Sequence, residues 1–196
     1  MDNTKIKIQV IIGSIRPDRF ADKPAAWITE AAKKIEGAEV EVIDLKDHPV
    51  PQFASPGYPS SVKDGNYGNE MINAFAKKIG AADAFIIVTP EYNHGYPGAL
   101  KDALDSVYME WNKKPVAFVA YGSALGARAV EQLRQVVVEL QMAPMRAAIH
   151  LPSDVFMAVS KEPTNLALFD PVAPKAADML NQLMWWAKAL KTARSQ

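Results

Sequence analysis

The segment AFIIVTPEYNHGYPGALKDALD, residues 84–105, joins a buried strand to an amphipathic helix and decides the fold. Its start, Ala84–Thr89, is almost continuously apolar, which is typical of a parallel strand covered on both faces. Pro90 fixes the backbone just past this strand, and a polar loop follows. The apolar residues of the next part recur with the i, i+3, i+4, i+7 spacing of one helical face: Leu100, Ala103, Leu104 and Val107.

The same alternation of strand and helix runs along the rest of the chain. Further buried strands are predicted at Ile6–Ile12, Glu39–Leu45, Val116–Tyr121 and Arg146–Leu151. The other helices are indicated by sets with helical spacing: Ile28, Ala31, Ala32 and Ile35; Ile72, Phe75, Ala76 and Ile79; Leu133, Val136, Val137 and Leu140; Ala176, Met179, Leu180 and Leu183.

Gly, Asp and Pro residues predict where three of these helices begin or end. Gly37 and Gly80 stand where C-terminal helix caps belong. Asp170 is an expected N-cap, and Pro171 is the expected first residue of a C-terminal helix over 171–193.

This alternation predicts an α/β fold with a three-layer, doubly wound, five-stranded parallel sheet and right-handed crossovers. Five strands with five helices fit the flavodoxin-like strand order 2-1-3-4-5. Ligands then bind beyond the carboxyl ends of the strands, where the order reverses between strands 1 and 3. The length of 196 residues suits one domain, 1–196. Two stretches are expected to be irregular: loop 47–69, as a functional lid or a packed surface excursion, and residues 153–169.

Composition excludes several classes of function. Lys and Arg balance Asp and Glu, 22 against 22, so no broad basic surface for nucleic acid is expected. Cysteine is absent, which excludes disulfides, thiolate catalysis and cysteine–metal sites. No apolar stretch approaches the roughly 18–20 residues of a membrane span, and the N-terminus does not resemble a secretion signal. We expect a cytoplasmic protein that contacts neither membrane nor nucleic acid.

The loop after the first strand, GSIRPDRFA at residues 13–21, predicts an anion site. It offers the hydroxyl of Ser14, the guanidinium groups of Arg16 and Arg19, and backbone N–H groups that enter a helix. A phosphate monoester fits such a helix start. The alternative is that Ser14 only caps the helix and that the arginines are solvated. The glycine patterns of nucleotide-binding P-loops and dinucleotide folds are missing.

The loops after the third and fourth strands predict a site for a flat ligand. Glu91, Tyr92 and Asn93 provide an aromatic ring and peptide groups, as a planar heteroaromatic needs. His94 is an acid–base candidate or a plain surface residue, and Glu91 alternatively holds neighbouring N–H groups or a partner chain. In YGSALG, residues 121–126, small residues let the backbone approach a ligand. A ligand that is anionic at one end and flat at the other is indicated, and flavin mononucleotide (FMN) has that shape.

Three runs of sequence carry a resemblance to a known family. GSIRPDRFADKPAAWI, TPEYNHGYPGALKDALD and AYGSALGARA resemble the NADPH-dependent FMN reductases of the flavodoxin-like superfamily, which include quinone, azo-dye and chromate reductases. The resemblance implies an FMN phosphate site made by Ser14, Arg16, Arg19, Phe20 and Ala21. It implies that the isoalloxazine ring is bordered by Pro90, Glu91, Tyr92 and Asn93, and that its pyrimidine edge is approached by Gly122 and Ser123.

The chain also departs from the family pattern. Phe20 and Ala21 stand where polar residues are usual, so fewer side chains are expected to reach the phosphate. Further departures are Asp102 for a common Asn, Ser106 near a usual Trp, and Tyr121 where Gly is common.

The function indicated is hydride transfer from NADPH or NADH through FMN to a small acceptor such as a quinone, a free flavin or an azo compound. No catalytic side chain and no metal ligand is assigned. The alternatives are a flavodoxin-type electron carrier and a non-redox module that binds a phosphate ligand. Arg19 and Arg128 are candidates to meet the 2′-phosphate of NADPH.

A homodimer or homotetramer is expected from the resemblance and from the apolar third helix. That helix and the residues after it carry more apolar surface than one sheet face should need: Leu100, Val107, Tyr108, Met109 and Trp111. The alternative is a large core within one chain.

Overall fold

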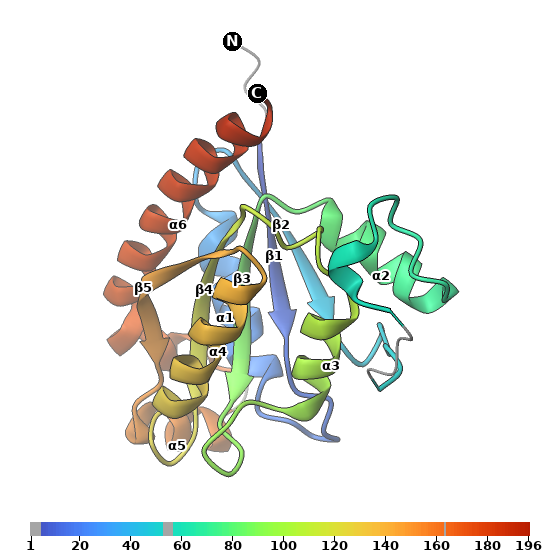
Figure 1. The fold of residues 1–196 in the computed structure, drawn as a ribbon. Helices are drawn as coiled ribbons and strands as arrows, with labels where there is room; N and C mark the ends of the chain where they lie inside the picture. Colours follow the sequence, from blue (N-terminus) through green and yellow to red (C-terminus); the bar gives the residue numbers. More distant parts are fainter. Residues whose placement is uncertain (1–4, 53–56, 163) are drawn as a thin grey trace.

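The protein is a parallel sheet between two layers of helices, seen in a computed structural model that describes residues 5–52, 57–162 and 164–196 (Figure 1). Its strands pair in the order β2-β1-β3-β4-β5, and every pairing is parallel. The predicted strand order is therefore confirmed. The strands are β1 (Ile6–Ile12), β2 (Ala38–Asp44), β3 (Ala84–Pro90), β4 (Pro115–Tyr121) and β5 (Ala143–His150).

The buried side chains of the sheet form two separate cores, one on each of its faces. In β3, Ile86 and Val88 pack against one helical layer, whereas Phe85 and Ile87 pack against the other, because successive side chains of a strand point to opposite faces. The first layer holds α1 (Asp22–Lys33), α5 (Ser153–Lys161) and α6 (Ala173–Arg194). The second holds α2 (Glu70–Gly80), α3 (Gly98–Ser106) and α4 (Ala127–Glu139).

The stretch expected to be irregular, 153–169, contains helix α5, so that prediction is wrong. Its signal is weak, since only Val155 and Val159 bury a side chain within one short helix. The predicted start of the last helix is also wrong. Pro171 lies inside a 3₁₀ helix, Leu166–Val172, and α6 begins two residues later. Burial of Phe169 and Val172 sets this geometry, because tertiary packing outweighs the local capping preference.

Neither predicted glycine is the C-terminal cap of its helix. Gly37 has φ +80° in the turn between α1 and β2, and its carbonyl accepts a hydrogen bond from the N–H of Ile6 at 2.8 Å. It lies beyond the cap residue of α1, which is Lys34. Gly80 is the last helical residue of α2 and not a left-handed cap.

Part of the long predicted loop is fastened to the body of the protein. The hydroxyl of Tyr67 donates to Glu110 at 2.6 Å and accepts from the N–H of Tyr108 at 3.1 Å. A short 3₁₀ helix, Pro59–Ser61, interrupts the loop. Residues 53–56 of the loop lie outside the described residues. This anchoring of Tyr67 favours a packed surface excursion over a lid for the C-terminal end of the loop. Within the described ranges, no helix is long and apolar enough to cross a membrane.

The apolar surplus around α3 is accounted for within one chain. Leu100, Val107 and Trp111 are at most 1 % exposed and belong to the core under α2, α3 and α4. Tyr108 packs against the same core, and Met109 remains exposed. The predicted oligomer therefore loses this line of support and stays a prediction on the resemblance alone.

Candidate functional site

Three loops meet at the carboxyl edge of the sheet. The hydroxyls of Ser14, after β1, and Tyr92, after β3, are hydrogen-bonded at 2.9 Å. The guanidinium carbon of Arg16 lies 5.6 Å from the centre of the Tyr92 ring, a cation–π contact. The loop after β4 joins them, because the N–H of Glu91 donates to the carbonyl of Tyr121 at 2.8 Å. The predicted convergence of these loops is observed.

The loop after β1 presents free hydrogen-bond donors. It turns at Pro17 and Asp18, with Asp18 at φ +48°. Among the described residues, no carboxylate pairs with the exposed Arg16, and none accepts from the backbone N–H groups of Arg19, Phe20 and Ala21. These N–H groups stand at the start of α1, where the helix dipole adds positive potential. The donor set suits a dianionic phosphate.

Arg19 does not present its guanidinium to this surface. The side chain is 3 % exposed and is held by the two carboxylates of Asp22 and Asp44 and by the carbonyl of Ser14. Its Nη1 lies 2.8 Å from Asp44 Oδ1, and its Nε lies 2.6 Å from Asp22 Oδ1. The expectation that two guanidinium groups face the phosphate is corrected to one, that of Arg16.

The ion pair between Arg19 and Asp44 ties the loop to the end of β2. Hydrogen bonding to Asp44 is the main cause that raises the pKa of Arg19, against the opposing effect of burial. Burial acts to raise the pKa of the Asp44 carboxyl, but hydrogen bonds from Arg19 and from the N–H of Lys46 lower it overall. Both partners therefore remain charged. Neither aspartate was singled out in the sequence, although Asp22 directly follows the loop; Asp44 lies 25 positions from Arg19.

The segment after β3 forms a tight hairpin turn. Tyr92 and Gly95 exchange backbone hydrogen bonds of 2.8 and 3.0 Å. Asn93 and His94 between them have φ of +49° and +70°, the left-handed pair that a type I′ turn requires. Both side chains are exposed at the tip, while the ring of Tyr92 points back to Ser14.

Glu91 serves structure by bracing this hairpin against α4. Its side chain is only 2 % exposed, and it accepts from the backbone N–H of Arg128 at 3.1 Å and from the guanidinium of the same residue. Arg128 also meets Nε2 of His94 at 2.7 Å, and Gln132 donates to the His94 carbonyl at 2.9 Å. The alternative interpretation of Glu91, a holder of neighbouring N–H groups, is confirmed.

Close backbone packing explains two glycines in the loop after β4. A Cβ on Gly122 would lie 3.0 Å from Cβ of Glu91, and the φ of +149° is one that other residues rarely adopt. A Cβ on Gly126 would lie 2.5 Å from Cβ of Ala120, at φ +72°. Ser123 is exposed between them. Gly122 is thus packed against Glu91 at the base of the hairpin, and Gly126 is packed against the end of β4.

An aromatic cluster lies behind the phosphate loop, at the position where the family usually has polar side chains. The ring of Phe20 lies 4.8 Å from Tyr121 and 4.4 Å from Phe156 of α5, measured between centroids. Ala21 is fully buried. Phe20 and Ala21 therefore offer backbone groups alone, as their apolar character suggested. Phe156 was missed because α5 was not predicted.

Sequence comparison decides the family. The model of the NADPH-dependent FMN reductase family matches residues 6–155. The chain belongs to this family. Over 150 residues it is 41 % identical to the NAD(P)H-dependent FMN reductase of Schizosaccharomyces pombe, covering 76 % of this chain and 74 % of the relative. The quinone reductase of Escherichia coli K12 is 32 % identical over 143 residues, with 69 % and 71 % covered.

Solved structures share the fold. The flavoenzyme NAD(P)H:acceptor oxidoreductase FerB of Paracoccus denitrificans superposes with a TM-score of 0.62 at 22 % identity, covering 90 % of this chain and 98 % of that one. An archaeal flavodoxin superposes with a TM-score of 0.57 at 13 % identity, covering 91 % and 99 %. The flavodoxin-like fold is confirmed, and it does not by itself separate reductases from electron carriers.

Proposed function

We propose that the protein is an FMN-dependent oxidoreductase that takes hydride from NADPH or NADH and passes it to a small acceptor such as a quinone, a free flavin or an azo compound. The observation that carries this proposal is Arg16 above the ring of Tyr92, beside backbone N–H donors; neither the guanidinium nor these donors have an acceptor partner among the residues that the structure describes. An anion site and an aromatic surface then adjoin one another at the edge where this fold binds ligands. Relatives named for quinone and azo reduction support the acceptor class.

The residues of this chain would bind and orient the cofactor. Ser14, Arg16 and the N–H groups of Arg19, Phe20 and Ala21 would hold the phosphate. The edges of the ring system would meet the hairpin Pro90, Glu91, Tyr92 and Asn93 and the backbone of Gly122 and Ser123. Bound FMN would supply the hydride chemistry, since it can accept and release two electrons.

The backbone after β4 has a second role in this proposal. N–H groups at Gly122 and Ser123, next to the start of α4, would favour negative charge on a reduced ring system. Glu91 and Arg128 keep these groups in place and need not touch the cofactor. No side chain has to move a proton, so no catalytic residue is assigned.

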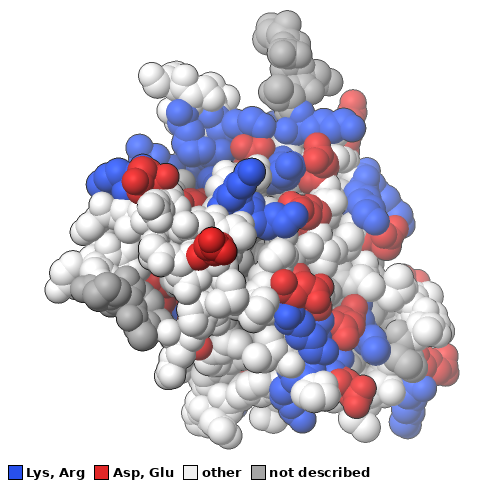
Figure 2. Space-filling model, turned by 90° about the vertical axis from the view of Figure 1, so that its right-hand side faces the viewer, with Lys and Arg blue, Asp and Glu red and all other residues white. Residues whose placement is uncertain are grey.

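A flavodoxin-type electron carrier is the second candidate, because an archaeal flavodoxin shares the fold. Such carriers are usually acidic. The net charge here is zero, and Figure 2 shows Lys and Arg interspersed with Asp and Glu over one face. This charge pattern favours the reductase. We propose further that the protein is cytoplasmic and forms a homodimer or homotetramer, on the resemblance to its family.

The visible absorption spectrum of the purified protein tests the proposal. One equivalent of FMN is added, the spectrum is recorded, and NADPH or NADH is then added without oxygen. We expect bound flavin that is bleached by the nicotinamide and recovers its colour when a benzoquinone is added. Bound flavin that neither nicotinamide bleaches would favour the carrier. A protein that takes up no FMN would favour the remaining alternative, a non-redox module that binds a phosphate ligand.

A further inference from the structure

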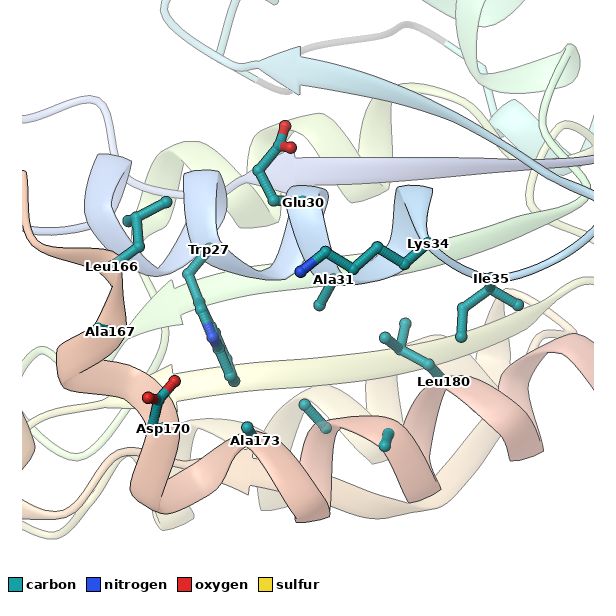
Figure 3. A pocket seen from close by; sticks show the side chains of 12 residues that line it. Trp27, Glu30, Ala31, Lys34, Ile35, Leu166, Ala167, Asp170, Ala173 and Leu180 are labelled. Atoms are coloured by element: carbon teal, nitrogen blue, oxygen red, sulfur yellow. The ribbon is translucent and has the colours of Figure 1, made fainter.

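A cavity of about 460 Å³ lies away from the loops of the candidate site, between α1, the 3₁₀ helix Leu166–Val172 and α6 (Figure 3). None of the twelve described residues that line it belongs to the loops after β1, β3 or β4. Its size falls in the range of roughly 300–1,000 Å³ that small-molecule sites occupy. At Lys34 and Ile35 it continues into a second hollow of about 610 Å³ beside Trp185.

Small side chains keep this space open. Ala31 of α1 and Ala173 of α6 lie on opposite sides of the gap between the helices, where larger residues would fill it. Ala176 of α6 lines the same cavity. The walls are apolar, with Ile35 and Leu180 at one end. The apolar part of the cavity therefore favours the flat apolar body of a ligand.

Trp27 supplies a hydrogen-bond donor without a partner. Its side chain reaches from α1 toward α6 (Figure 3). The ring stacks on that of Phe169, with ring centroids 4.8 Å apart. The residue is only 7 % exposed, and its indole N–H meets no acceptor in the described part of the chain. The nitrogen is not sealed in the core as that of Trp111 is, and the residue lines the cavity. Buried indoles usually have an acceptor at this position.

The charges at the rim favour an acceptor oxygen. Glu30 is paired with Lys33 at 2.8 Å. Lys34 has no carboxylate partner among the described residues, and in Figure 3 its side chain extends along α1 toward Trp27. Asp170 lies on the other side of the indole. An oxygen placed at the indole N–H would thus have the Lys34 ammonium nearby.

We propose that this cavity binds a flat aromatic molecule that carries an acceptor oxygen, with a carboxylate preferred to a neutral group. The ring lies against Trp27 and the alanines, and the oxygen accepts from the indole N–H beside Lys34. The site is separate from the flavin site and does not depend on it.

Titration calorimetry with 2-naphthoate tests the proposal, on protein with and without one equivalent of FMN. We expect binding of equal affinity in both cases. Trp27→Phe keeps the ring but removes the N–H, and should weaken binding roughly 2- to 10-fold. Ala31→Leu should weaken it more than about tenfold by filling the cavity. Ala26→Leu, at an exposed position of the same helix, is the matched control and should change nothing.

Four outcomes would overturn the proposal. The first is no measurable binding at millimolar naphthoate. The second is that 2-naphthylmethylamine binds as tightly as naphthoate, which would remove the need for an acceptor oxygen. The third is loss of binding when FMN is present, which would place naphthoate in the flavin site. The fourth is that Ala31→Leu breaks a dimer, which would make a second copy of the chain the occupant.

Discussion

Replacing Arg19 with methionine should destabilise the protein by about 3 kcal/mol, although Arg19 lies in a loop assigned to ligand binding. The substitution keeps most of the side chain's length and removes its charge. It also strands the Asp44 carboxylate, whose side chain is 21 % exposed and whose remaining donor is the N–H of Lys46 at 2.9 Å. Removing one partner of a buried ion pair costs about 3–5 kcal/mol. Water can reach Asp44, so the lower end applies.

The bond to Asp22 adds little to this figure, because that carboxylate is 45 % exposed and solvent screens the pair. At about 2–4 °C per kcal/mol for a chain of this size, the melting temperature should fall by about 6–12 °C. Thermal and urea unfolding followed by far-UV circular dichroism measure this. Arg16→Met is the matched control in the same loop, and its melting temperature should stay within about 2 °C of the parent protein.

A double variant separates the stranded charge from lost packing. Arg19→Met with Asp44→Leu removes both charges, and replacing a whole buried pair by apolar residues is often neutral. It should recover much of the lost stability. If Arg19→Met melted with the parent protein, or if the double variant were no more stable than the single one, the role assigned to Arg19 as the anchor of the loop would be wrong.

Three further predictions concern single side chains. Arg16→Ala should weaken FMN binding by about ten- to a hundredfold, on the scale of a charge-assisted hydrogen bond, without a change in unfolding; fluorescence titration measures it, and unchanged affinity would contradict the phosphate role. Glu91→Gln should lower the free energy of unfolding by about 1 kcal/mol, a modest loss because Arg128 is partly solvated. Urea unfolding measures this, and an unchanged free energy would contradict the bracing role of the Glu91–Arg128 ion pair. Burial and the nearby Arg194 lower the pKa of Lys114 to about 8. Between pH 8 and 10 the folded chain has then released a proton that the unfolded chain keeps, so stability should rise with pH by at most about 1.4 kcal/mol per unit; Lys114→Gln should abolish the rise and Lys113→Gln should keep it.

The sequence predicted the strands and their order because strong apolar runs and helical spacings agree with one another along the chain. It failed at residues 153–172, where the burial of Phe169 and Val172 sets the local structure and the helix that ends at Lys161 buries few side chains. These are long-range effects that a local pattern does not contain. The same is true of the partners of Arg19, since Asp44 is 25 positions away and meets it only when β2 lies beside β1.

The three arginines around the site differ in what holds them, and this difference limits what each can bind. The guanidinium of Arg19 is enclosed by two carboxylates, and that of Arg128 is shared between Glu91 and His94. To meet the 2′-phosphate of NADPH, Arg19 would have to give up a carboxylate, and the exchange would leave Asp44 without its cation. Arg128 holds Glu91 through Nε and Nη2, so its Nη1 would have to leave His94. Arg16 has no such partner in the described ranges, and a phosphate at the start of α1 would occupy it. None of the three is therefore free to select NADPH over NADH, and we infer that the two nicotinamides react at rates that differ by less than about tenfold unless another part of the chain supplies the cation.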